Sequence, residues 1–404
     1  MISLAVLSVV LCVACVPAQS DQASSLVMSS DPALTQAAAR LLPDLADRSG
    51  LELLEPVRLE RRTRVELERY LEFKLDEELP VDEAELLTES YGLLGLVPRD
   101  MDLRAVLKGL YLEQVAGFYD PDSTTLFVLD DQPDDALESL LVHELVHAIQ
   151  DQSVDLDAIT DSELGNDRQV AAQAAIEGHA TLVMFEFLMG LQGGAVDPTG
   201  MTNFTDLVRP ALEAARTQSS ALAGAPLVLQ ESLLFPYLGG ASFVEALWKQ
   251  ESGRPPPFGE RLPASTEQIL HPERLLGDEP DFPVTLEVIA PEGWTRLYDG
   301  DLGELETGIL LETHMGSRAP ADGWDGDRYV LLENAEGVRA LAWVSVWDSE
   351  SQRDRFIEAL RPHLGGFPTE AAVVRRDVNG RPGALLLLGD APDVETYLAG
   401  LGGS

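Results

Sequence analysis

Cysteine is almost absent from this 404-residue chain, and its only two, Cys12 and Cys15, lie close to the start. The remainder therefore has no disulfide framework and no thiolate metal site. Basic residues are also scarce: 28 Lys and Arg stand against 69 Asp and Glu, a formal net charge of −41. A field of that sign repels phosphate backbones, which argues against nucleic-acid binding. Hydrophobic residues make up 45% of the chain, enough for a sizeable core.

Long apolar runs are also missing, and we expect no membrane span after the start of the chain. Residues 1–16 form an uncharged apolar run, shorter than the ~20 residues that a span needs, and this predicts an export signal. Two processing patterns remain open. Val16-Pro17-Ala18 ends on the small residue of a leader-peptidase site, whereas Cys12-Val13-Ala14-Cys15 resembles a bacterial lipobox with Cys15 as the lipidated residue. We therefore expect an exported protein, either secreted or periplasmic, or an envelope lipoprotein attached to the membrane only through Cys15.

The patterning predicts a signal in residues 1–18, a flexible tether in 19–31, a first domain in 32–275 and a C-terminal α+β domain in 280–404. In the first domain, helices are expected at 32–48, 63–78, 82–94, 102–114, 133–152, 167–190, 205–217, 226–235, 239–250 and 265–271, with a strand at 56–61 and a hairpin of 117–119 and 124–129. In the second, strands are expected at 283–289, 328–333, 338–346, 371–378 and 383–388, and helices at 301–314, 349–363 and 392–400. Asn379-Gly380 predicts a tight hairpin turn.

The clearest chemical signal is the H-E-x-x-H motif formed by residues 143–147 on a predicted helix. His143 and His147 lie about 40° apart on such a helix, so both imidazoles can bind one metal ion. Glu144 lies at the edge of that face, where it can reach a metal-bound water as a general base. The helix is apolar almost all round, so its polar groups need partners. The alternative is a pair of core histidines that are satisfied by local hydrogen bonds.

A zinc site needs a third protein ligand, and the next long helix offers Glu177 and His179. Helical spacing places Glu177 on an apolar face and His179 beside Arg168 and Glu186, facing solvent. A Glu on an apolar face is costly unless it is paired, so Glu177 is the preferred ligand. An ion pair with an Arg is the alternative for Glu177. Gly178 lacks a side chain where two helices can approach closely.

At these residues the chain resembles the zincin metallopeptidases, in particular the gluzincin group, whose third ligand is a Glu on a later helix. The resemblance implies Zn²⁺ bound by His143, His147 and Glu177, with Glu144 as the base in peptide-bond hydrolysis. No His follows at the spacing of the metzincin group. Longer stretches look similar to a group of exported bacterial and archaeal proteins with no assigned substrate, namely residues 117–121, 143–152, 176–178, 235–237 and 265–272.

The resemblance also suggests roles around the metal. Zincins often stabilise the oxyanion with a Tyr or His, and Tyr237 and His271 are the candidates, with Tyr119 weaker. Asp151 can orient a ligand imidazole from behind. Zincins hold extended substrate along an antiparallel edge strand, a role that falls to Thr124–Leu129, unless this is an ordinary hairpin.

The expected fold class is thus α+β, with a zincin-like, mainly helical metallopeptidase core that contains a small β-hairpin or sheet, and a C-terminal α+β domain. The expected function is an exported zinc metallopeptidase that acts on peptides or proteins. Two alternatives remain: a catalytically inactive zinc-containing lipoprotein that binds peptides or envelope components, and a metal-free scaffold lipoprotein. The sequence does not predict the oligomeric state.

Overall fold

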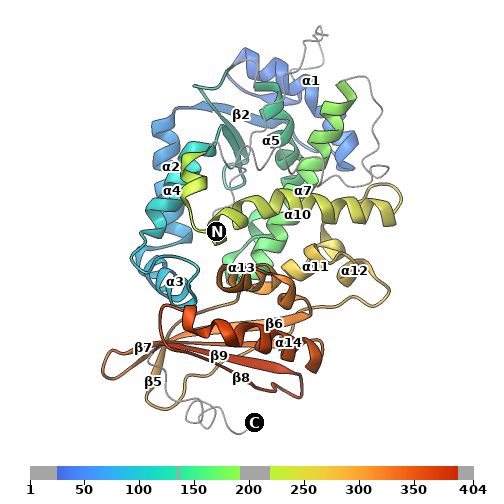
Figure 1. The fold of residues 1–404 in the computed structure, drawn as a ribbon. Coiled ribbons are helices and arrows are strands. Elements are labelled where there is room, and N and C mark those ends of the chain that lie inside the picture. Colours follow the sequence, from blue (N-terminus) through green and yellow to red (C-terminus); the bar gives the residue numbers. More distant parts are fainter. Residues whose placement is uncertain (1–24, 134–136, 192–218, 390–404) are drawn as a thin grey trace.

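The computed structural model describes residues 25–133, 137–191 and 219–389, and the fold is mixed α+β. Helices dominate the first part of the chain, and a five-stranded sheet forms the end opposite α1 (Pro32–Ser49) and α5 (Leu137–Asp151) (Figure 1). The export signal and the expected helices at 205–217 and 392–400 lie outside the described residues, as does most of the tether.

The first sheet is small and mixed, and its strands are β1 (Val27–Met28), β2 (Val57–Arg62), β3 (Gly117–Asp120) and β4 (Thr125–Leu129). Their order is β1-β2-β4-β3; β1, β2 and β4 are parallel, and β3 is antiparallel to β4. The expected hairpin is therefore present. However, β4 lies between β2 and β3, so β3 rather than β4 is the edge strand on this side of the sheet. The expectation of an edge strand at Thr124–Leu129 is therefore wrong.

The helices of this part begin where the sequence supplies a cap. Asp31 accepts hydrogen bonds at the start of α1, and Thr63 and Glu66 form a capping box at the start of α2. The longer helices are α1 (Pro32–Ser49), α2 (Arg64–Glu78), α3 (Val81–Leu94), α4 (Leu103–Gln114), α5 (Leu137–Asp151), α7 (Asn166–Leu191) and α10 (Leu227–Gln250). The short ones are α6 (Leu156–Ile159), α9 (Ser220–Gly224), α11 (Thr266–Leu270) and α12 (Glu273–Leu276).

Helix α10 corrects one expectation, since it is a single helix rather than two. Pro236 and the pair Gly239-Gly240 lie inside it. Both residue types favour a break, but the helix is buried along much of its length, so packing outweighs local propensity. Gly240 instead permits the close crossing described below.

Helices α7 and α10 are also long and apolar enough to cross a membrane by length and composition. The expectation that no segment after the start would qualify is therefore wrong. In each, 67% of the most apolar window is buried inside the protein, and a buried core helix meets the same criteria of length and composition.

The C-terminal sheet has the order β5-β6-β7-β9-β8 with all pairs antiparallel. Its elements are β5 (Trp294–Gly300), α13 (Gly303–Met315), β6 (Trp324–Asn334), β7 (Arg339–Trp347), α14 (Glu350–Leu360), β8 (Ala371–Arg375) and β9 (Gly383–Gly389). The expected strand at 283–289 is not a strand: among the described residues its main chain bonds to the sheet through Val284 and Asp325, while the side chains of Leu286 and Val288 cover one face of the sheet. Strand β5 was not predicted. The turn at Asn379-Gly380 has positive φ at both residues, as a type I′ hairpin requires.

One apolar core joins the two parts of the chain. It runs without a break from α1 through α5, α7 and α10 to α13, α14 and one face of the C-terminal sheet. Polar contacts cross the expected boundary as well: Asp301 accepts from the backbone N–H of Asp167 at 2.7 Å, and Leu305 donates its N–H to Thr266 Oγ1 at 3.1 Å. Asp301 thereby binds an otherwise free N–H at the start of α7.

Candidate metal centre

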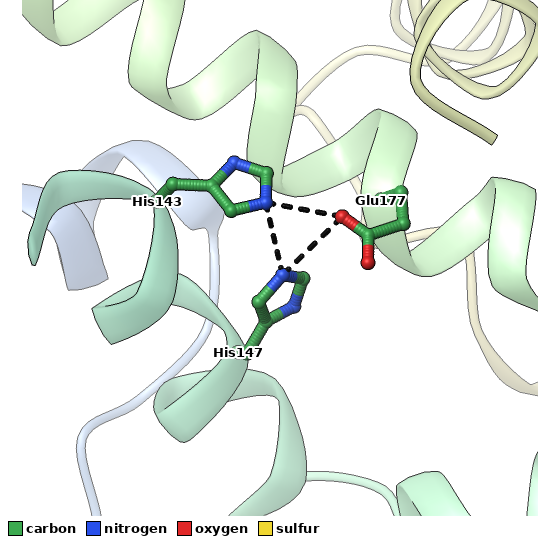
Figure 2. A group of neighbouring side chains, drawn as sticks. All are labelled: His143, His147 and Glu177. Carbon is green, nitrogen blue, oxygen red and sulfur yellow. Dashed lines mark hydrogen bonds and ion pairs between the residues drawn. The ribbon is translucent and has the colours of Figure 1, made fainter. Parts of the chain in front are cut away.

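Helices α5 and α7 bring together three side chains that can hold a metal ion. His143 and His147 extend from successive turns of α5, and Glu177 faces them from α7 (Figure 2). His143 Nε2 lies 3.0 Å from Glu177 Oε2 and 3.1 Å from His147 Nε2, and His147 Nε2 lies 3.4 Å from Glu177 Oε2. The sequence predicted this trio, and all three members are buried, with 4–8% of their surface exposed.

The three distances suit ligands that share one ion. Two ligands about 2.05 Å from a tetrahedral metal are about 3.3 Å apart, close to the separations found here. Two imidazoles and a carboxylate also match the donor preference of zinc. An Arg partner for Glu177, the alternative left open by the sequence, is not found among the described contacts of its carboxylate, whose two neighbours are the histidines.

Glu144 follows His143 on α5 but makes a different contact. Its Oε2 accepts the backbone N–H of Tyr119 on β3 at 3.1 Å, and only 2% of the residue is exposed. Burial raises the pKa of Glu144 to about 8. The outward N–H of the edge strand β3 therefore points at the side chain expected to act as the base.

A backbone crossing between α7 and α10 sets the position of Glu177. A Cβ built on Gly178 would lie 2.0 Å from the carbonyl carbon of Gly240, and one on Gly240 would lie 1.8 Å from the carbonyl oxygen of Ala174. No other residue fits at either point, so the close helix approach expected at Gly178 is present. One turn before Gly240, Tyr237 places its ring centroid 6.0 Å from that of His143.

His179 does not face solvent, and this expectation is wrong. It is completely buried: its Nε2 lies 3.0 Å from the carbonyl oxygen of Ser49, and its Nδ1 lies 2.9 Å from Gln150 Nε2. Helix α7 is covered on nearly all sides, so the helical wheel does not identify an exposed face at this turn. Burial lowers the pKa of His179 to about 4.

Asp151 does not orient a ligand histidine, contrary to expectation. Its Oδ2 accepts the hydroxyl of Tyr119 at 2.7 Å. The side chain behind His147 is Gln150, whose Oε1 lies 2.8 Å from His147 Nδ1. Gln150 was not among the residues predicted from the sequence, although a Gln on a buried helix face three residues after the second His was a usable signal.

The charges in the cluster act on one another. The pKa of Glu177 is lowered, because the neighbouring histidines outweigh the effect of burial, which acts in the opposite direction. The pKa of His147 is raised, because the charge of Glu177 outweighs burial there too. At His143 the effect of burial prevails over that of Glu177, and the pKa is lowered.

His271 has a partner elsewhere. It follows α11, and its Nε2 lies 3.0 Å from Glu304 Oε1 on α13. Among the described contacts none joins His271 to the three ligands.

A further acidic group is formed by Glu267, Asp281 and Asp348, and one carboxylate oxygen of each lies within 4.8 Å of the other two. Arg274 forms ion pairs with all three, so this group is balanced by a cation of the chain.

Comparison with known proteins gives one match. The model of a family described as a domain of unknown function, DUF8575, matches residues 294–385, which is less than half of the chain. The match covers most of the C-terminal sheet with α13 and α14, and it excludes His143, His147 and Glu177. No curated protein and no solved structure matches the chain.

Proposed function

We propose that the protein is an exported, zinc-dependent metallopeptidase with a zincin-like core. The observation that carries the proposal is the convergence of His143, His147 and Glu177 from two helices on one point, with Glu144 beside them. A structural zinc site has four protein ligands, whereas a catalytic one has three and an open position. Among the described residues three ligands converge, which favours the catalytic class.

The chemistry follows from where each side chain lies. Zinc held by His143, His147 and Glu177 would supply a Lewis acid, which lowers the pKa of a water to about 7 and polarises a carbonyl. Glu144 in its ionised form would take a proton from the water as the water oxygen attacks the carbonyl carbon, and would deliver that proton to the amine nitrogen as the C–N bond breaks. Because Glu144 accepts the N–H of Tyr119, the base is held beside the edge strand.

Substrate binding is assigned to β3, which replaces the strand expected from the sequence. β3 is the antiparallel edge strand, and it packs against α5. An extended peptide can add to such an edge through main-chain hydrogen bonds. For the oxyanion we choose Tyr237 over His271, because the ring of Tyr237 lies near His143 whereas His271 is bound to Glu304.

The low exposure of the site favours a second candidate, a zinc-containing module that binds peptides or envelope components without hydrolysing them. His143, Glu144 and His147 are each at most 5% exposed. The presence of a well-placed Glu144 speaks against this candidate, because a site that only holds metal has no use for a base.

Metal analysis and one variant test the proposal. Purified protein should contain about one zinc per chain, and a metal content near zero would refute it. Glu144→Gln should retain the zinc and lose cleavage of unfolded-protein and peptide substrates. A parent protein that holds zinc but cleaves no member of a broad peptide library would favour the binding module.

A further inference from the structure

Behind the metal ligands lies a buried row of polar groups that joins three helices. His147 and Gln150 are on α5, His179 is on α7, and the row ends at the carbonyl of Ser49, the last residue of α1. Gln150 and His179 have no exposed surface. We propose that Gln150 and His179 form a relay of hydrogen bonds that fixes the tautomer of His147 and points its Nε2 at the metal. The part of this proposal that concerns the metal rests on the proposed function.

Two backbone carbonyls, which can only accept, set the direction of the relay. The carbonyl of Ser49 lies 3.0 Å from His179 Nε2, so that nitrogen carries the proton and His179 Nδ1 is an acceptor. The carbonyl of Ile176 lies 3.0 Å from Gln150 Nε2, so the amide nitrogen of Gln150 points toward α7. The two assignments are independent and agree, because Gln150 Nε2 then donates to His179 Nδ1 at 2.9 Å.

The direction of the relay determines the state of His147. With its nitrogen turned toward α7, Gln150 presents Oε1 to His147 Nδ1 at 2.8 Å, and an oxygen can only accept there. Neutral His147, the form that binds a metal, therefore carries its proton on Nδ1 and leaves the Nε2 lone pair for an ion. His143 differs, because its buried Nδ1 has no hydrogen-bond partner among the described residues.

Gln150 is thus a positioning residue rather than a catalytic one. A second partner that fixes the tautomer of a ligand histidine is typically worth about 10–100-fold in metal affinity. His179 acts one step further out. Loss of its ring leaves the carbonyl of Ile176 to hold the amide of Gln150, so the effect on the metal should be smaller.

The first test is spectroscopic and needs no metal. The chain has only six histidines, so ¹⁵N-histidine labelling gives a spectrum that single His→Gln variants can assign. In metal-free protein at neutral pH, two-bond ¹H–¹⁵N correlations should show His179 protonated on Nε2 alone. Protonation on Nδ1 instead would reverse the relay and overturn the inference.

The second test measures zinc affinity by competition with a chromophoric chelator. Gln150→Met keeps the size of the side chain and removes the amide, so affinity should fall about 10–100-fold. His179→Phe should cause a smaller loss. The matched control is Gln152→Met, because Gln152 bonds to the backbone of Leu54 and Glu55, outside the relay, and to no other residue that the structure describes. Zinc affinity should stay within about twofold in this variant.

The outcomes separate the relay from the proposed function. Unchanged zinc affinity in folded Gln150→Met overturns the positioning role, whatever the enzyme does. A sharp Nδ1–H signal of His147 in zinc-loaded parent that is lost in Gln150→Met supports it. If the parent binds no zinc while His179 carries its proton on Nε2, the proposed function fails and only the direction of the relay stands.

Discussion

Gly178 of α7 and Gly240 of α10 meet backbone to backbone, with 2.0 Å between a Cβ built on Gly178 and the carbonyl carbon of Gly240. Two buried helices can come this close only where both lack side chains. Each glycine is near a site residue, since Glu177 precedes Gly178 and Tyr237 lies one turn before Gly240. The crossing therefore sets the distance between the metal site and α10.

This contact makes Gly178→Ala strongly destabilising. A methyl group there overlaps the backbone of α10, and overpacking of this kind costs typically about 1–3 kcal/mol, and more where backbone must move. We expect the free energy of unfolding to fall by at least about 3 kcal/mol in urea titrations. Zinc affinity should fall as well, because Glu177 moves with the helix.

Gly109→Ala is the matched control, since Gly109 lies within α4 and nothing is within 4 Å of its built Cβ. Alanine in an open helix position stabilises by about 0.5–1 kcal/mol relative to glycine. The crossing would lose its proposed importance if both variants changed stability in the same direction by the same amount.

The members of the trio were predictable from the sequence because helical spacing and the apolar surroundings of Glu177 select them, although their convergence also needs α5 and α7 to pack together. His143 and His147 are one turn apart on a helix, and Glu177 lies on an apolar stretch where only a partner makes it tolerable. The buried position of His179 was not predictable in this way. Its partners come from Gln150 and the end of α1, and no periodicity in α7 reveals what packs against it.

The same distinction applies to the fold. Capped helices such as α1 and α2, and the turn at Asn379-Gly380, follow local rules and were predicted. The join in α10 across residues 236–238 was missed, because Pro236 favours a break locally and its tolerance here depends on the packing of a buried helix. Similarly, the strand pattern of 283–289 arises from residues that cover a sheet without joining it.

Tyr237→Phe tests the assignment of the oxyanion group. If the hydroxyl of Tyr237 stabilises the developing charge, its loss should lower kcat by about 10²–10³-fold, the usual cost of one such donor. KM and zinc content should change little, because the ring that packs near His143 remains. Equal loss of kcat and zinc would instead show that Tyr237 only supports the ligands.

Glu306 should make stability depend on pH. This glutamate on α13 is 3% exposed and accepts the hydroxyl of Tyr91 on α3 at 2.6 Å. Burial raises its pKa to about 7, with Asp301 and Asp327 adding to the shift while Tyr91 and Asn166 oppose it. The folded protein then keeps a proton between pH 4.5 and 7 that the unfolded chain has released.

Stabilisation from this group is therefore complete below about pH 4.5 and is lost as pH rises through about 7, by an amount on the order of 3 kcal/mol. In Glu306→Gln that part of the pH slope should vanish, so the variant gains stability relative to the parent between pH 5 and pH 8. Urea titrations at both values measure it. Glu358→Gln, which removes an exposed charge on α14, serves as the control. Parallel slopes for the parent and Glu306→Gln would contradict the prediction.

The continuous core predicts that the two parts of the chain unfold together. Four of the five tryptophans lie after residue 293, at positions 294, 324, 343 and 347, so fluorescence reports mainly on the C-terminal sheet. Most of the long helices precede residue 251, so far-UV circular dichroism reports mainly on the helical part. Since Asp301 binds the start of α7 and Tyr91 bonds to Glu306, neither part keeps its contacts when the other unfolds. The two signals should give one coincident transition in urea. Midpoints that differ clearly would show that the sheet folds independently, as the sequence alone suggested.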